Sequence, residues 1–204
     1  MVIAMARPRT FDETAVLDAA AREFRVHGYA DTSTEQLCAA AGVRRSSLYN
    51  AFTSKDELFV RALEHYVETT GRRQAAILAD DAVSGAARLH ALIDVVIDEE
   101  VQASKRGHAA GCMVVQSLLS PDLRERDPRV ARILDRDLRE RTSLLAEAIR
   151  AGRLDGSVNE DTDPDDGAML VNTVISGMRV TAQTGVTPEA LRRITLAALG
   201  SILN

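Results

Sequence analysis

The sequence predicts an all-α protein of nine helices in two domains, and three observations support this expectation. Aromatic residues make up only 3% of the 204 residues, tryptophan is absent, and β-branched residues do not alternate with polar ones, so strand patterns are weak. Apolar residues recur instead at helical spacing. Side chains that favour helix starts stand in front of most of these segments.

Six positions have helix-start signals of two kinds. In a capping box, a hydroxyl and an acid or amide three residues later bind each other's backbone amides. Elsewhere, a capping side chain stands before a proline, a residue favoured at the first helical position. The boxes begin at Thr10, Ser33 and Ser54, and the capped prolines follow Asp127, Asp163 and Thr187. The predicted helices span 11–27, 34–41, 44–51, 55–79, 84–103, 108–120, 128–151, 164–184 and 188–203.

The first three predicted helices have the clearest pattern. Helix 11–27 has an apolar stripe and is expected to end at Gly28, with Tyr29 packed under the turn. Helices 34–41 and 44–51 are joined by Gly42, which is expected to adopt a left-handed conformation. Small side chains before this glycine would let the two helices cross closely, as in a helix-turn-helix.

The exposed face of helix 44–51 is basic and rich in hydroxyl groups. No acid occurs between residues 44 and 50, and Lys55 follows soon after. These groups suit base edges and phosphates. The candidate DNA-binding residues on this face are Arg44, Arg45, Ser46, Ser47, Tyr49 and Asn50.

The stretch from Thr10 to Leu58 resembles the DNA-binding domain of the TetR/AcrR family of bacterial repressors. The matching motifs are Ala19-Ala20, Phe24-x-x-x-Gly28-Tyr29, Thr32-Ser33, Ala40-Ala41-Gly42-Val43, Ser47-Leu48-Tyr49-x-x-Phe52 and Ser54-Lys55-x-x-Leu58. The resemblance implies a homodimer that binds a near-palindromic operator on double-stranded DNA, with a helical C-terminal domain that binds a small-molecule effector and releases the DNA. It also implies roles for single residues. Thr32, Ser33, Tyr49 and Lys55 would contact phosphates, and Arg44, Arg45 and Ser46 would read bases.

Two positions depart from the family pattern, and the rest of the chain resembles it less closely. Asn50 stands where histidine is common, and Ser46 where glycine is common. We expect a DNA-binding domain at 1–54 and a ligand-binding and dimerisation domain at 55–204. The alternative is a small-molecule-binding protein or an enzyme whose three-helix head is vestigial.

Charge and composition exclude several classes of protein. The net charge of −5 argues against coating nucleic acid or an anionic membrane by bulk charge. The longest stretch without charged residues, Gly107 to Pro121, is too short to cross a bilayer, so we expect a cytoplasmic protein without a membrane span. The four histidines have no recognisable catalytic partners, and no glycine-rich loop suits a phosphate. We therefore expect neither an enzyme nor a cofactor.

Two cysteines are too few for a disulfide framework, so Cys38 and Cys112 are expected to be free thiols. His108 and Cys112 lie four residues apart, but two ligands do not make a metal site, and we expect none. Cys112 is predicted to line the ligand pocket or to act as a sensing thiol. Its alternative role is that of a small buried residue.

Helices 164–184 and 188–203 are expected to form the homodimer interface. Neither Gly167–Met178 nor Ile194–Asn204 contains a charged residue, and one chain cannot easily cover both surfaces. Pairing with their symmetry mates in a four-helix bundle would bury them, with Leu191 and Ile194 in the interface. The alternative is that other helices of the same chain cover them.

A mainly apolar pocket with a few polar groups is predicted among the C-terminal helices. Its polar groups are Tyr66, Gln116, Asn172 and Ser176. Asn172 and Ser176 belong to a polar stripe with Arg179 and Gln183. Because buried polar groups need partners, this stripe faces either a ligand or the dimer seam.

Overall fold

The computed structural model describes residues 12–105 and 111–204, and these ranges contain ten helices and one isolated bridge, between Val158 and Leu203. The all-α prediction is confirmed. The helices are α1 (Glu13–Asp31), α2 (Thr34–Ala41), α3 (Arg45–Phe52), α4 (Lys55–Leu78), α5 (Gly85–Lys105), α6 (Met113–Leu118), α7 (Pro121–Arg126), α8 (Pro128–Asp155), α9 (Pro164–Ala182) and α10 (Pro188–Ala198). No helix in the described ranges is long and apolar enough to span a membrane.

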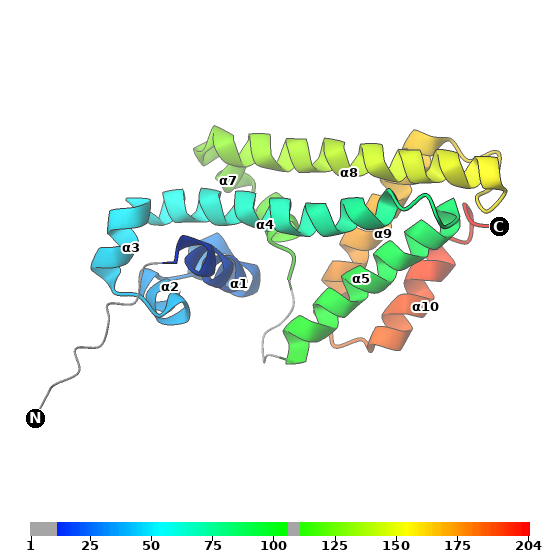
Figure 1. Cartoon of the computed structure of the whole chain (residues 1–204). Coiled ribbons are helices and arrows are strands. Elements are labelled where there is room, and N and C mark those ends of the chain that lie inside the picture. The colour runs from blue at the N-terminus through cyan, green and yellow to red at the C-terminus, as the bar shows by residue number, and fades with distance from the viewer. Residues whose placement is uncertain (1–11, 106–110) are drawn as a thin grey trace, which may run out of the picture.

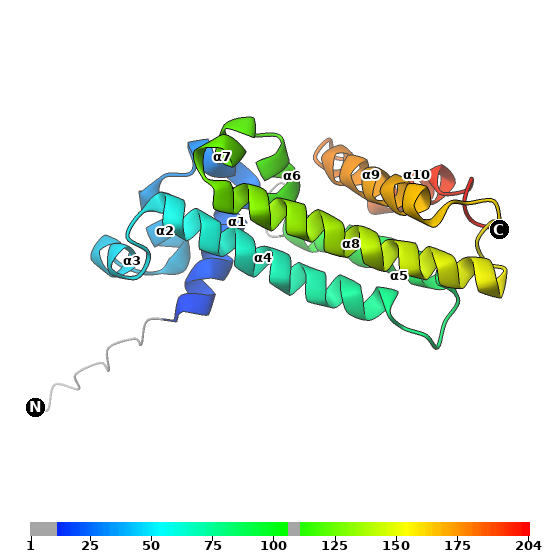
Figure 2. The same cartoon turned by 90° about the horizontal axis from the view of Figure 1, so that it is seen from above.

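Helices α1, α2 and α3 gather at one end of the molecule, which we call the head (Figure 1). The two longest helices, α4 and α8, pack side by side and run in the same direction away from it. Helices α5, α9 and α10 form the other end, where the chain terminates. Seen from above, α9 lies along α8 on the side away from α4 (Figure 2).

Most helices begin where the sequence predicts. The capping box at Ser33 is complete, because Ser33 Oγ accepts from Gln36 N at 3.2 Å and Gln36 Oε1 accepts from Ser33 N at 2.7 Å. At Ser54 only the hydroxyl caps the helix, since the Glu57 carboxylate binds Arg129 instead. The side chains before the three prolines all accept hydrogen bonds from the first turns of their helices.

Helix α1 begins later than predicted. Asp12 caps it by accepting from Ala15 N at 3.1 Å, whereas Thr10 lies outside the described residues. The predicted end at Gly28 is a break, where φ of 72° and ψ of 175° leave the helical region and suit glycine alone. One further turn follows the break.

The helix predicted over 108–120 is too long in its described part, where α6 spans only Met113–Leu118, and α7 was not predicted. Pro121 lacks the amide that would continue α6, and it starts α7 instead. The last helix is also shorter than predicted, ending at Ala198. Beyond it Ile202 O accepts from Asn159 N at 3.0 Å, so the final residues pack against the turn after α8.

Two clusters of buried apolar residues form the core. The first joins the head to the first half of α4 and to α6, α7 and the start of α8. The second joins the rest of α8 to α5, α9 and α10. Residues from Leu58 to Val67 belong to the first cluster, so the packing around the head extends beyond the predicted boundary at residue 54, which remains a prediction.

Candidate nucleic-acid interface and ligand pocket

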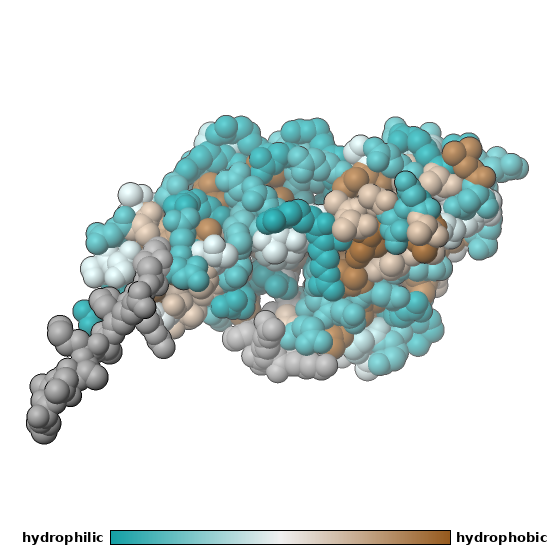
Figure 3. All heavy atoms as spheres, viewed as in Figure 1, coloured by the Kyte–Doolittle hydropathy of each residue, from teal (hydrophilic) through white to brown (hydrophobic). Residues whose placement is uncertain are grey.

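Helix α3 is held at the end of the head by a small apolar core. Gly42 adopts the predicted left-handed conformation, with φ of 64°, and Val43 N donates to Cys38 O at 3.1 Å. Leu37, Leu48 and Phe52 are buried beneath the turn. This packing leaves the opposite face of α3 to solvent, and the head surface in Figure 3 is mostly hydrophilic.

Three of the predicted DNA-binding residues are exposed and make no side-chain hydrogen bond or ion pair with the described residues. The side chains of Arg44, Ser46 and Asn50 are exposed, and none has a hydrogen-bond partner within the described residues. Arg44 occupies the N-cap position of α3 without capping it. These side chains can reach a nucleic acid without first breaking a contact.

Two other residues of this face are already engaged. Arg45 Nη1 donates to Glu35 Oε1 at 2.9 Å, and its guanidinium carbon lies 5.5 Å from the centre of the Tyr49 ring. The Tyr49 hydroxyl lies 3.3 Å from Thr34 Oγ1, and hydrogen bonds with Thr34 and Arg45 lower its pKa. Thr34 and Glu35 were not predicted, because their proximity to α3 depends on the helix crossing.

Thr32 does not fit the predicted phosphate contact. Its side chain is buried, and its hydroxyl donates to Gly28 O at 2.6 Å, which closes the break in α1. Ser33 is exposed and caps α2, and Ser47 is half-buried. The hydroxyl of Ser33 therefore remains accessible at the start of α2, whereas that of Thr32 has a structural role.

Lys55 is held in place at the start of α4. Its Nζ lies 4.4 Å from the centre of the Tyr29 ring and donates to Ala30 O at 3.5 Å. Burial lowers the pKa of the Lys55 ammonium group. Burial also raises the pKa of the Tyr29 hydroxyl, which donates a hydrogen bond to Asp56. The predicted packing of Tyr29 under the turn thus also orients the lysine.

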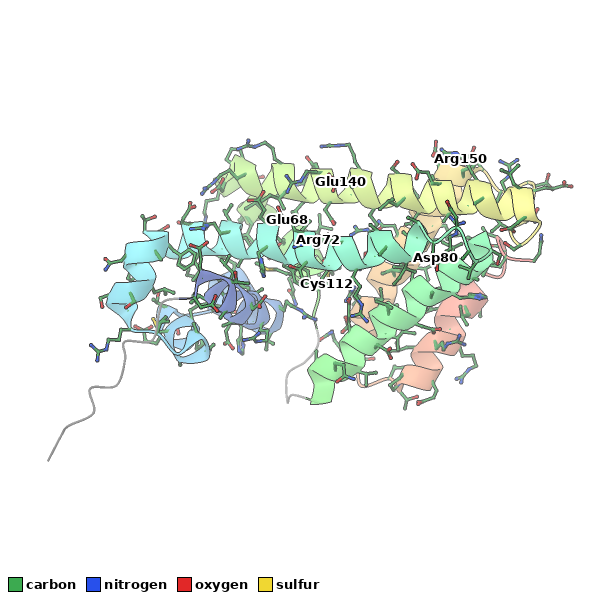
Figure 4. All side chains as sticks on the ribbon, in the orientation of Figure 1. Glu68, Arg72, Asp80, Cys112, Glu140 and Arg150 are labelled. Carbon is green, nitrogen blue, oxygen red and sulfur yellow. The ribbon has the colours of Figure 1, made fainter. Side chains whose placement is uncertain are left out.

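Four of the five predicted ligand-binding residues line one cavity of about 160 Å³ between α4, α6, α8 and α9. They are Tyr66, Cys112, Asn172 and Ser176, whereas Gln116 lies outside the lining. The Tyr66 hydroxyl, 3.7 Å from Cys112 Sγ, donates to that sulfur, and burial raises its pKa. Cys112 lies beside the middle of α4, away from α3 (Figure 4).

The polar stripe of α9 finds its partners within the same chain. Arg141 of α8 donates from Nε to Asn172 Oδ1 at 2.8 Å and from Nη1 to Asp137 Oδ2 at 2.8 Å. Ser176 donates to Asn172 O. Neither of the two predicted partners, ligand or dimer seam, is needed to satisfy the side-chain oxygen of Asn172.

Arg179 lies at the centre of a buried ionic cluster. Its Nη1 donates to Glu100 Oε1 at 2.6 Å and its Nη2 to Glu99 Oε2 at 2.7 Å, which ties α9 to α5. The other Glu100 oxygen, Oε2, is buried and has no hydrogen-bond partner in the described ranges. Burial raises the pKa of this carboxyl group. The sequence did not predict this cluster, because Arg179 lies about 80 residues from Glu99 and Glu100 along the chain.

Arg25 connects the head to the pocket. Its Nε donates to Gly111 O at 2.5 Å, and its guanidinium carbon lies 5.4 Å from the centre of the Tyr66 ring. A Cβ at Gly111 would lie 2.4 Å from Arg25 O, so the two backbones are in close contact. The end of α1 therefore touches two segments that line the pocket.

The outer surface of α9 and α10 is partly apolar. Met169, Val180 and Ile194 are exposed by 45%, 50% and 55%. Leu191, predicted in the interface, is only 4% exposed and belongs to the second core cluster.

Comparisons with protein families match both parts of the chain. A family model described as bacterial regulatory proteins, tetR family, matches residues 16–62. A second, described as a tetracyclin repressor-like C-terminal domain, matches residues 85–198.

Individual proteins resemble the chain over nearly its whole length. It is 30% identical over 192 residues to the HTH-type transcriptional repressor ComR of Escherichia coli (strain K12), which covers 92% of this chain and 87% of ComR. A cysteine mutant of the TetR family regulator CifR, solved with 26-bp operator DNA, is 32% identical with a TM-score of 0.79, covering 97% of this chain and all of that one. The regulatory protein TetR from Rhodobacter sphaeroides shares the fold at 20% identity, with a TM-score of 0.81 over 95% of this chain and all of that one.

Proposed function

This chain belongs to the tetR family of bacterial regulatory proteins and is a DNA-binding transcriptional regulator, and we propose that it represses transcription as a homodimer on a near-palindromic operator. The observation that supports the DNA contacts best is the exposed face of α3, where the side chains of Arg44, Ser46 and Asn50 have no hydrogen-bond partner among residues 12–105 and 111–204. Arginine and amide side chains suit base edges in the major groove. Lys55, Ser33 and Tyr49 lie around this face and would contact phosphates.

The homodimer is proposed to form through α9 and α10. Their exposed apolar side chains are not covered by the described residues, and a twofold pair would bury them in a four-helix bundle. Two copies of α3 would then enter successive major grooves about one helical turn apart.

Selection from a random duplex pool, followed by fluorescence anisotropy over a range of salt concentrations, tests this function. We expect a near-palindromic site bound with an affinity at least about 10³ times that for random DNA. Equal affinity for all duplexes would instead support a small-molecule-binding protein with a vestigial head.

An effector in the pocket is proposed to release the DNA through Arg25. This arginine contacts the Gly111 carbonyl and the Tyr66 ring, so a ligand that moves either segment also moves the end of α1. The break at Gly28 follows directly, and α2 and α3 come next. Cys112 lies on the same lining and is proposed to contact this effector.

Arg25→Met tests the coupling, because it keeps the apolar stem of the side chain and removes the contact with Gly111. We expect the variant to bind operator as the wild type does but to need at least about tenfold more effector for release. Arg22→Met is the control, since Arg22 is exposed on the same helix. Unchanged release by the Arg25 variant would show that the signal reaches the head by another route.

A further inference from the structure

We propose that the pocket between α4, α6, α8 and α9 takes a small uncharged molecule, about the size of a substituted benzene ring, with one hydrogen-bond acceptor. This inference rests on the proposed function, because it names the chemical class of the effector. It follows from the volume, the charge balance and the unused hydrogen-bond donors of the lining.

The volume limits the size of the ligand. The cavity measures about 160 Å³. An apolar cavity of about 150 Å³ holds one benzene molecule. A single ring with one small substituent therefore fits this volume, and a larger ligand would extend to the surface beside Leu118, Leu138 and Met169, which are exposed by 47%, 38% and 45%.

The charge balance of the lining favours an uncharged ligand. Every charged side chain of the lining already has an oppositely charged partner: Arg124 pairs with Asp135, Arg141 with Asp137, and Arg179 with two glutamates of α5. Asp137 and Arg179 are themselves buried. Beside the buried Asp137 and Arg179, a ligand charge would lose part of its hydration and find no free counterion, which is unfavourable.

The lining does offer hydrogen-bond donors. The Asn172 side-chain oxygen accepts a hydrogen bond from Arg141. The NH₂ group of the same Asn172 amide has no partner within the described residues. The Gln74 amide, also on the lining, has no side-chain partner either. A carbonyl or hydroxyl oxygen of the ligand can accept from these groups.

The remaining walls are apolar. They come from α6, α8 and α9 and consist of Val114, Val115, Leu118, Leu134, Leu138, Met169 and Ile175. A ring would contact these side chains while its oxygen faces Asn172. The pocket is thus apolar on most sides and has a few donor groups, as small-molecule sites usually do.

A second, open groove of about 490 Å³ between α4 and α8 shares Gln74, Asp137 and Arg141 with the pocket. Its other lining residues include Glu68, Arg72 and Glu140, which lie on the facing stretches of α4 and α8 (Figure 4). The Asp137–Arg141 pair therefore separates an outer charged groove from the inner pocket.

Four single-ring probes of similar size and different charge test the proposal on the full-length protein. They are benzamide and benzyl alcohol, which are neutral, benzoate, which is anionic, and benzylammonium, which is cationic. We expect the neutral probes to raise Tm and to release operator at concentrations at least tenfold lower than the charged ones. Equal or better binding of either charged probe would overturn the proposal.

Changing the charge balance should change the preference. Asp137→Asn keeps an acceptor for Arg141 and removes the negative charge, so we expect benzoate to gain at least tenfold relative to benzamide. Glu147→Gln is the matched control, because Glu147 is an exposed acid on the same helix outside the lining. Asn172→Asp is the opposite change, which should favour benzylammonium. An unchanged order of probes in both charge variants would overturn the proposal.

The outcomes separate the ligand class from the proposed function. If the wild type binds operator and only larger or charged compounds release it, the ligand class is wrong and the regulator function stands. If the wild type binds no operator, the function fails, and the Tm measurements still decide the ligand class.

Discussion

Arg44 and Arg45 are neighbours in the sequence, but their side chains have different surroundings. In the part of the chain that the structure describes, the Arg44 side chain has no hydrogen-bond or ion-pair partner, whereas Arg45 is paired with Glu35 and packed on the Tyr49 ring. If Arg45 contacts DNA, it must first give up its ion pair with Glu35. If Arg44 contacts DNA, it gives up only bound water. We predict that Arg44→Ala costs about 1–3 kcal/mol of binding free energy and relaxes preference at particular base pairs, and that Arg45→Ala costs less. Anisotropy with single-base operator variants measures both, and equal losses on random DNA would contradict base reading.

Lys55 should behave differently from the arginines. Its position against Tyr29 is fixed before binding, and a phosphate contact is insensitive to sequence. We predict that Lys55→Ala weakens binding to all duplexes alike and reduces the slope of log affinity against log salt by about one. A change in base preference, with the slope unchanged, would assign Lys55 to base reading instead.

The buried Glu100 carboxyl links protonation to stability. Burial raises its pKa above the ordinary value of 4.5, so the folded protein binds this proton more tightly than the unfolded chain. Its contribution to stability is present below the unfolded pKa and is lost as pH rises through the folded pKa. We predict that Glu100→Gln, which can still accept from Arg179, gains stability relative to wild type as pH rises from 4 to 8. Urea unfolding across this range measures it, and a pH-independent difference would contradict the prediction.

Helix boundaries were predictable where the signal is local. Ser33, Asp127 and Thr187 cap helices through atoms two or three residues away, so sequence spacing is sufficient evidence. Helix α7 was missed, although Ser120 and Pro121 stand in the same order as at the other helix starts. The predicted helix 108–120 ended at this proline, and the next predicted helix began only at residue 128.

Glycine positions at helix crossings give a prediction about packing. A Cβ at Gly85, the first residue of α5, would lie 2.4 Å from backbone atoms of Ala148 and Gly152 on α8. Gly71 lies inside α4 with nothing within 4 Å of such an atom. We predict that Gly85→Ala lowers the free energy of unfolding by about 1–3 kcal/mol. Gly71→Ala should raise it by about 0.5–1 kcal/mol. Denaturant titration compares them, and equal effects would mean that α5 and α8 do not cross so closely.

The sequence reveals the DNA-binding face more completely than the pocket, because the residues of the face are neighbours in the sequence and those of the pocket are not. The DNA-binding face lies on one short helix, so its candidates were adjacent in the sequence. Pocket residues come from five helices, and residues of unusual polarity, such as Asn172 and Ser176, could be recognised. Their partners Arg141 and Asp137 stand in a segment where basic and acidic residues alternate, a pattern typical of a solvated helix face, and the burial of Asp137 depends on packing between helices.

The proposed dimer gives the last prediction. Ile194 is 55% exposed on α10, while Leu191 is 4% exposed and packs inside the chain, so only the first reports on association. Leu191→Arg would damage the fold itself. Ile194→Asp would place a charge in the proposed interface, where it has no partner. Val83→Asp is a control, because Val83 is an exposed apolar residue outside α9 and α10.

We predict that the wild type and Val83→Asp are dimers at micromolar concentration, and that Ile194→Asp is a folded monomer. Because both half-sites must be held about one helical turn apart, the monomer should lose most of its specific affinity, by about 10³-fold. Its residual binding to random DNA should remain, since the α3 face is intact. Sedimentation and anisotropy measure the two effects together. A dimeric Ile194 variant, or a monomer with full operator affinity, would place the interface or the basis of specificity elsewhere.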